Sequence, residues 1–165
     1  MAKIRPIRKA DIRDFREALG EVAVERKYLL TLETPSFDSI RTFVQNNIEK
    51  DYPQYVAEVD ERIVGWADFV PVDKPSLVHC ASLGMGVLKE HRRQGIGSAL
   101  LDAVTRAALV RGFSRLELEV FANNRAAIAL YEKYGFELEG TKRRARCIDG
   151  VFQDVLIMAQ IVADA

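Results

Sequence analysis

The sequence predicts one domain of the α+β or mixed α/β class, with a strand, a glycine-containing loop, a helix and a second strand at its centre. Short runs of alternating apolar residues predict strands, and runs with a helical period lie between them. A length of 165 residues suits one compact unit with a substantial core. No repeat, low-complexity tract or linker interrupts the chain, so we expect a single domain over residues 1–165.

The first third of the chain is expected to be mainly helical. Residues 3–8 alternate as a short strand, and Asp11 is placed to cap a helix whose apolar positions extend to Val24. Residues 28–35 carry Pro and Thr and are expected to form a connection. Ser36 can then cap a second helix that continues through Ile48.

The middle of the chain predicts a hairpin followed by a buried strand. Residues 54–59 and 63–70 are expected to pair across a tight turn at residues 60–62. After a turn at residues 71–75, residues 77–88 are small and apolar and predict a strand despite Gly84 and Gly86. These glycines indicate that another group approaches the strand closely.

Helices and strands alternate in the last part of the chain. Residues 96–108 show helical periodicity, which Gly112 is placed to end, and residues 116–120 alternate as a strand. Asn123 or Asn124 can cap a further helix that Gly135 closes. Residues 136–144 and 151–161 then predict two strands that turn at residues 149–150.

Composition excludes several function classes. Lys plus Arg and Asp plus Glu both total 24, so no basic field favours nucleic acid. No apolar run approaches the roughly 20 residues that span a bilayer, and the polar start does not resemble a signal peptide, so we expect a cytoplasmic protein without a membrane partner. Two Cys and two His residues offer neither a disulfide framework nor zinc-ligand spacing, so we expect reduced thiols and no metal.

The basic loop over residues 87–98 is the strongest functional signal. It lies between a predicted strand and a helix start, where backbone N–H groups and the helix dipole bind anions, and Gly95 and Gly97 allow close approach. No Gly-Lys pair completes a P-loop, and neither glycine pair continues into a dinucleotide fingerprint. An ordinary strand-to-helix turn with solvated basic residues remains the alternative.

Two motifs resemble those of the GCN5-related N-acetyltransferase (GNAT) family. Residues 92–97 match its acyl-CoA signature Arg/Gln-x-x-Gly-x-Gly/Ala. A second family feature is matched by Asn124, Ala127, Leu130, Tyr131, Gly135 and Phe136. The resemblance implies a mixed, mostly antiparallel central sheet of about seven strands flanked by about four helices, with a splayed strand pair that forms the acyl-CoA cleft.

The resemblance also implies which residues bind acetyl-CoA, the expected co-substrate. A backbone N–H near Met85 would polarise the thioester carbonyl, and the loop would hold the pyrophosphate. Tyr131 would protonate the departing thiolate, although a packed helix aromatic is the alternative. The expected acetyl-CoA contacts are Met85, Gly86, Val87, Arg92, Arg93, Gln94, Gly95, Ile96, Gly97, Ser98, Asn124 and Tyr131.

The general base is left open between two carboxylates. Glu119 lies beside the expected cleft, but strand alternation could point it to solvent, and Glu33 could contact substrate or lie on an exposed loop. The basic cluster of residues 142–146 is expected to be a solvated edge, with an acidic substrate group or the CoA 3′-phosphate as alternatives.

The resemblance implies transfer of acetyl from acetyl-CoA to the primary amine of an amino acid or similar small molecule. The continuation at residues 136–141, with Asp149, Gly150 and Asp154, resembles bacterial amino-acid and small-amine acetyltransferases. A protein or peptide N-terminal acetyltransferase of the ribosomal-protein type is one alternative, and a non-catalytic CoA-binding regulatory module is another. Family members are often dimeric, so a homodimer is an expected assembly.

Overall fold

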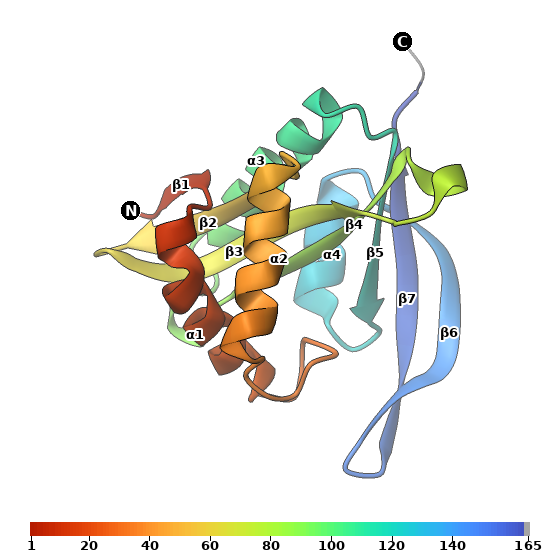
Figure 1. Ribbon diagram of the computed structural model, residues 1–165. Helices are drawn as coiled ribbons and strands as arrows, with labels where there is room; N and C mark the ends of the chain where they lie inside the picture. The colour runs from red at the N-terminus through yellow and green to blue at the C-terminus, as the bar shows by residue number, and fades with distance from the viewer. Residues whose placement is uncertain (164–165) are drawn as a thin grey trace.

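A seven-stranded sheet forms the centre of the molecule in a computed structural model that describes residues 1–163 (Figure 1). Its strands and helices follow in the order β1 (Lys3–Pro6), α1 (Ile12–Ala23), α2 (Phe37–Glu49), β2 (Gln54–Val59), β3 (Arg62–Pro71), β4 (Cys80–Val87), α3 (Ile96–Val110), β5 (Arg115–Phe121), α4 (Arg125–Lys133), β6 (Glu137–Ile148) and β7 (Val151–Ile161). This mixed sheet with four α-helices is the architecture that the family resemblance implies.

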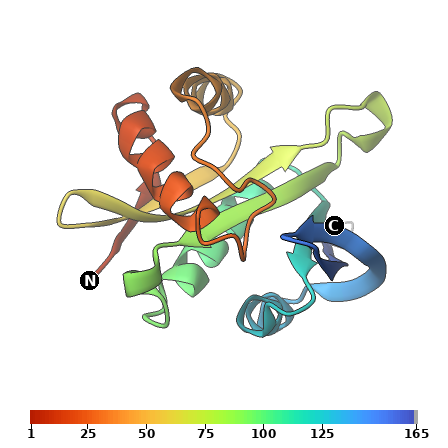
Figure 2. The same cartoon turned by 90° about the horizontal axis from the view of Figure 1, so that it is seen from below.

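The strand order across the sheet is β1-β2-β3-β4-β5-β7-β6. All neighbouring strands are antiparallel except β4 and β5, which are parallel. Helices α1 and α2 cover one face of the sheet, and α3 and α4 cover the other (Figure 2). The sheet is therefore the middle of three layers, with a different pair of helices on each face.

The parallel pair β4 and β5 separates soon after it forms. Only residues 80–82 of β4 pair with residues 115–117 of β5, although β4 continues to Val87 and β5 to Phe121. Both strands keep their outer neighbours, β4 with β3 over residues 81–87 and β5 with β7 over residues 115–121. One edge of each strand is consequently left without a strand partner, which confirms the predicted splayed pair.

The core packs against both faces of this sheet. Phe15 of α1 lies fully buried against Trp66 of β3, with ring centroids 5.8 Å apart in an edge-to-face arrangement. On the opposite face, α3 contributes Leu100 and Val104, which are also fully buried. The apolar residues that recur with a helical period over residues 96–108 thus form the core-facing side of α3, and the helix continues to Val110.

Local signals set several boundaries as predicted. β2 and β7 have the predicted bounds, and the turn between β2 and β3 places Asp60 and Glu61 at φ of 48° and 64°. Ser36 caps α2 by accepting a hydrogen bond from the Ser39 N–H at 3.2 Å. The predicted Asp11 cap is wrong, because its carboxylate accepts from Arg5 and from the Arg8 backbone instead.

Two strand boundaries differ from the prediction. β4 begins at Cys80 because Pro75–Leu77 forms a single 3₁₀ turn with proline at its start. β6 runs on to Ile148, past a bulge at Arg144, whose φ is 50°. In the described chain, no helix is long and apolar enough to cross a membrane.

Candidate active site

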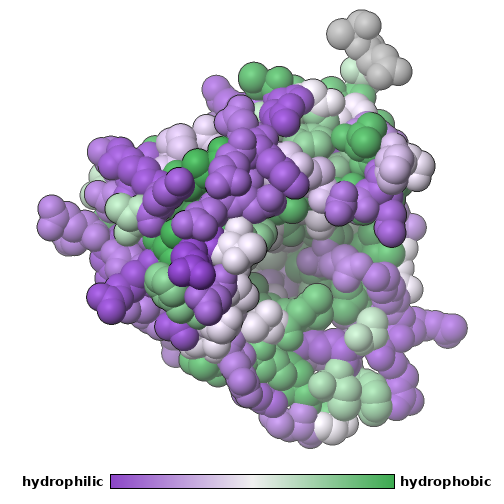
Figure 3. Space-filling model, in the orientation of Figure 1, coloured by the Kyte–Doolittle hydropathy of each residue, from purple (hydrophilic) through white to green (hydrophobic). Residues whose placement is uncertain are grey.

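A cavity of about 1190 Å³ lies where β4 and β5 diverge. Figure 3 shows a hollow on this face, at the place where Figure 1 draws β4, α4 and β5. Its walls come from the free edges of both strands, from α1, from residues 28–31, from the loop before α3 and from α4. Residues far apart in the sequence therefore converge on one space.

Two glycines of β4 make room for side chains of β3. Gly84 lies opposite Asp68, and Gly86 lies opposite Trp66. A Cβ on Gly86 would lie 2.4 Å from the Trp66 ring, and one on Gly84 would lie 3.1 Å from an Asp68 oxygen. The close approach indicated by these glycines thus includes two β3 side chains, both of which line the cavity.

The loop before α3 presents free backbone donors. In the described chain, the N–H groups of residues 93–98 have no hydrogen-bond acceptor, and α3 makes its first backbone bond from Ala99 to the Gly95 carbonyl at 3.0 Å. Arg93 and Gly95 have φ of 59° and 81°, the left-handed conformation found in loops whose successive N–H groups bind anions. The loop has the donors and the helix terminus that an anionic phosphate requires.

The Arg92 side chain holds this loop in place. Its Nε donates to the Val87 carbonyl at 2.8 Å, and its two Nη atoms bind Glu25 at 2.9 and 2.5 Å. The guanidinium also lies 4.6 Å from the centre of the Tyr28 ring. Arg92 therefore joins the end of β4 to the segment that follows α1, with its charge already paired.

Helix α4 brings Tyr131 to the cavity. Asn124 caps the helix, accepting from the Ala127 N–H at 3.3 Å, which selects it over Asn123. Tyr131 is only 7% exposed, and burial raises the pKa of its phenol to about 12. Tyr134, one position past the last residue of the helix, donates to the Ser98 carbonyl at 3.1 Å and fixes α4 against the first turn of α3.

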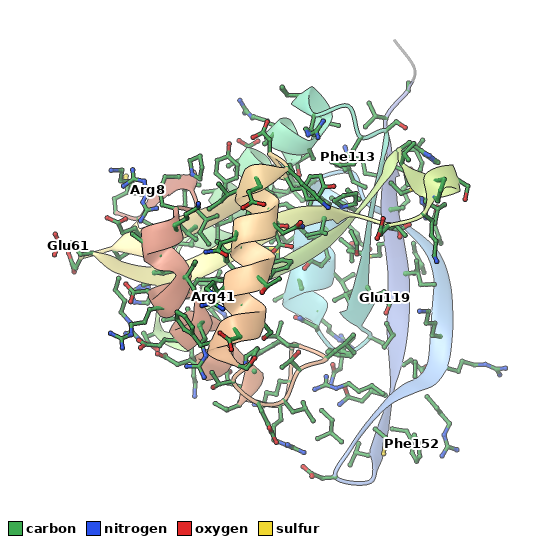
Figure 4. The ribbon with its side chains drawn as sticks, viewed as in Figure 1. Arg8, Arg41, Glu61, Phe113, Glu119 and Phe152 are labelled. Carbon is green, nitrogen blue, oxygen red and sulfur yellow. The ribbon has the colours of Figure 1, made fainter. Side chains whose placement is uncertain are left out.

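The two carboxylates considered as a general base lie in different places. Glu119 lies on β5 (Figure 4) and lines the cavity. Its side chain is about half exposed and forms an ion pair with Lys142. Glu33 is exposed and does not line the cavity. The structure therefore brings Glu119, but not Glu33, to the predicted site.

Arg146 does not belong to a solvated edge, contrary to the expectation for the cluster of residues 142–146. It is 7% exposed, stacks on Phe121 at 3.7 Å from the ring centre, and donates to the carbonyls of Arg26 and Lys27 at 2.8 and 2.9 Å. Burial lowers its pKa from the usual arginine value. Arg146 ties the segment after α1 to the β6–β7 side of the cleft.

Asp68 is a site residue that the sequence reasoning missed. It is 6% exposed, lines the cavity, and has a pKa raised to about 8 by burial. A sequence signal was present, because Asp68 is the single charged residue in the apolar run of residues 63–70. Strand alternation alone, however, does not say which face is open to a cavity.

The residues around the cavity fit acetyl-CoA. The free edge of β4 over residues 83–87 offers backbone groups to an extended amide-containing arm, and the donors of residues 93–98 lie beyond the end of that strand. Lys89 and Arg93 add positive charge to the same wall. In the part of the chain that the structure describes, no group of three His, Cys, Asp or Glu side chains is arranged to hold a metal ion.

A family model and the sequences of known proteins point to the same family. The sequence model of the acetyltransferase (GNAT) family matches residues 15–136. The L-amino acid N-acetyltransferase AaaT of Escherichia coli strain K12 is 30% identical over 157 residues, which cover 94% of this chain and 96% of the relative.

Solved structures agree on the fold. The ribosomal-protein-alanine N-acetyltransferase of Brucella melitensis superposes with a TM-score of 0.91 at 25% identity, covering 97% of this chain and 99% of the other. An acetyltransferase of Salmonella typhimurium, solved with its cofactor acetyl-CoA, gives 0.94 at 19% identity over 100% and 96% of the two chains. At that identity the likeness shows the fold alone.

Proposed function

Because the chain belongs to the GNAT acetyltransferase family and is an N-acetyltransferase that uses acetyl-CoA, we propose that its acceptor is the primary amine of an amino acid or a similar small molecule. One observation carries the proposal: a single cavity is lined by Arg93 and Gly97 of the loop with free N–H donors, by the open edge of β4 and by Tyr131. These are an anion site, a site for an extended arm and an acid.

The residues of this cavity supply the chemistry of acyl transfer. The N–H groups of residues 93–98 bind the pyrophosphate, and the β4 edge orients the pantetheine arm. A backbone N–H near Met85 stabilises the negative charge that develops on the thioester oxygen. Tyr131 keeps its proton at neutral pH, because burial raises its pKa, and gives that proton to the leaving sulfur.

The side of the cavity beneath α1 and α2 suits a small acceptor with an apolar part. Its walls on this side are mostly apolar, and they include Leu19, Val22, Leu29, Phe43 and Trp66. The relative named as an L-amino acid N-acetyltransferase aligns over almost the whole of both chains, which supports an amino-acid acceptor.

The N-terminal amine of a protein is the second candidate acceptor. It is favoured by the similarity to a ribosomal-protein-alanine N-acetyltransferase at 25% identity and a TM-score of 0.91. The proposal also includes the homodimer and the cytoplasmic location expected from the sequence, and light scattering of the purified protein tests the assembly.

A thiol-release assay distinguishes the two acceptors. The protein is incubated with acetyl-CoA and single amines from a panel of L-amino acids, polyamines and peptides with free N-termini. We expect thiol release with free amino acids and none with the matching N-acetyl amino acids. Fast release with peptides alone would replace the first candidate by the second, and no release with any amine would contradict the proposed function.

A further inference from the structure

Asp68 occupies the face of the sheet opposite the pyrophosphate loop. On β3, Gly65 faces Leu100 of α3, whereas Trp66 faces Phe15 of α1. Because side chains alternate along a strand, Asp68 shares the α1–α2 face with Trp66. The loop of residues 93–98 leads into α3, which covers the other face. An acceptor that enters beneath α1 and α2 would therefore reach the β4 edge past Asp68.

The Asp68 carboxylate has no partner of its own. Within residues 1–163 it forms no ion pair or hydrogen bond, and burial is the sole cause of its shifted pKa. Its register partner on β2 is Gln54, a neutral side chain whose Oε1 accepts from Asn47 at 2.9 Å. Gly84 on the other side has no side chain to offer.

The charged groups around the cavity are engaged elsewhere or come from other walls. Glu117 pairs with Arg115, Glu119 pairs with Lys142, and Arg92 pairs with Glu25. The remaining titratable side chains that line the cavity are Tyr28, Lys89, Arg93 and Tyr131. The cavity lining supplied by α1 and α2 is apolar, with Phe15, Leu19, Val22 and Phe43. Asp68 is thus the unpaired carboxylate on the apolar acceptor side.

We propose that Asp68 binds the ammonium group of the acceptor and takes its proton. This inference rests on the proposed function and adds the general base to it. A buried, unpaired carboxylate beside a glycine of the acyl-donor strand is placed for both tasks, because a cation satisfies its charge and the attacking nitrogen then lies next to β4. The assignment replaces Glu119 and Glu33 as the base.

The ammonium R–NH₃⁺ gives one proton to the Asp68 carboxylate and becomes R–NH₂. The nitrogen lone pair forms a bond to the thioester carbonyl carbon, the carbon–sulfur bond breaks, and the sulfur takes the Tyr131 proton. The nitrogen loses its second proton to the Tyr131 oxygen, and Asp68 releases its proton to solvent.

Burial of Asp68 suits this role. Its pKa of about 8 lies near that of the amine, so the proton can pass between them with little cost in free energy. An arriving ammonium group stabilises the charged carboxylate and lowers that pKa. In the free enzyme, activity as a base therefore rises with pH as Asp68 loses its proton.

The test compares D68N with the matched control D73N, the same change at an exposed position five residues along β3 and its following turn. For the panel amine with the fastest thiol release, kcat/KM is measured from pH 6 to pH 10. We expect D68N to lower kcat/KM by about 100-fold or more and to lose the rise near pH 8, whereas D73N keeps both. A D68N profile equal to wild type would overturn the inference and leave the proposed function standing.

A second measurement needs no turnover. Carbon-13 NMR of carboxyl-labelled aspartate follows the Asp68 titration, which D68N identifies by the loss of one signal. We expect n-butylammonium chloride to lower its midpoint by about one pH unit or more, and tetramethylammonium chloride, which has no N–H, to lower it less. If wild type acetylates no amine, the proposed function fails. In that case an Asp68 pKa in the usual aspartate range, or a midpoint that n-butylammonium does not lower, would overturn the ammonium site as well.

Discussion

Arg92, which lines the cavity, and Glu25 form a bidentate ion pair with N–O distances of 2.9 and 2.5 Å. Glu25 lies just after α1, and Arg92 opens the loop whose N–H groups at residues 93–98 are free. From β6, Arg146 binds the carbonyls of Arg26 and Lys27. Two arginines from different parts of the fold therefore hold consecutive residues of the segment after α1.

This pair predicts the effect of R92K. A lysine keeps the charge but cannot bind Glu25 and the Val87 carbonyl together, so we expect about 1–2 kcal/mol less stability and acetyl-CoA affinity lowered about tenfold. Urea denaturation and calorimetry with acetyl-CoA measure the two effects. As control, R106A removes an exposed pair with Asp102 and should change stability by less than about 0.5 kcal/mol. Equal acetyl-CoA affinity in R92K and wild type would show that the loop keeps its shape without this pair.

Tyr131 and Tyr134, at the end of α4, predict separate effects on activity and on stability. Y131F should lower kcat about 100-fold with acetyl-CoA affinity unchanged, since it removes only the acid. Because the pKa of Tyr131 is about 12, wild type should show no fall in rate from this group below about pH 10. Y134F should instead lower stability by about 1 kcal/mol, because it removes the bond to the Ser98 carbonyl. Stopped assays at saturating acetyl-CoA and thermal unfolding distinguish them, and a Y131F rate equal to wild type would remove Tyr131 as the acid.

Gly86 in β4 and Gly140 in β6 predict different outcomes for the same substitution to alanine. G86A places a methyl group 2.4 Å from the Trp66 ring, which is buried against Phe15 and has little room to move. We expect a loss of about 2–3 kcal/mol in chemical denaturation. G140A in β6 has nothing within 4 Å of the new methyl and should be neutral or slightly stabilising. Equal stability of both variants would mean that Trp66 can repack.

Local sequence signals predicted the features that depend only on residues close by in the sequence. Ser36 and Asn124 cap their helices as proposed, because a cap needs only its own first turn. Asp11 failed as a cap because Arg5, on the preceding strand, competes for its oxygens. Arg146 and Asp68 depend on which face of a strand meets another segment, and such contacts arise only when distant segments fold together. The family motifs located the loop and Tyr131 and carried no information about β3.

Asp68 also predicts a conflict between stability and activity. The unfolded chain loses this proton near pH 4, whereas the native carboxyl keeps it until about pH 8. Between these values the native state binds more protons than the unfolded state, so the contribution of Asp68 to the free energy of unfolding falls as pH rises. The side chain introduced by D68N is uncharged in the native and the unfolded state, so it does not lower the free energy of unfolding as pH rises. We therefore expect D68N to be more stable than wild type, by an amount that grows from pH 5 to pH 8 and levels off above it.

Urea denaturation at pH 5, 6, 7, 8 and 9 measures this difference, which we expect to exceed about 1 kcal/mol at pH 8. D11N is the control of opposite sign. Although burial opposes its charge, the pKa of Asp11 is lowered by hydrogen bonds from Arg5 and from the Arg8 backbone, so its stabilisation is present above about pH 4 and is lost as pH falls through the native pKa. D11N should therefore destabilise the protein across the same pH range. A D68N variant that is less stable than wild type at pH 8 would mean that the carboxylate is satisfied in the free enzyme, because only an unsatisfied buried charge makes its removal favourable.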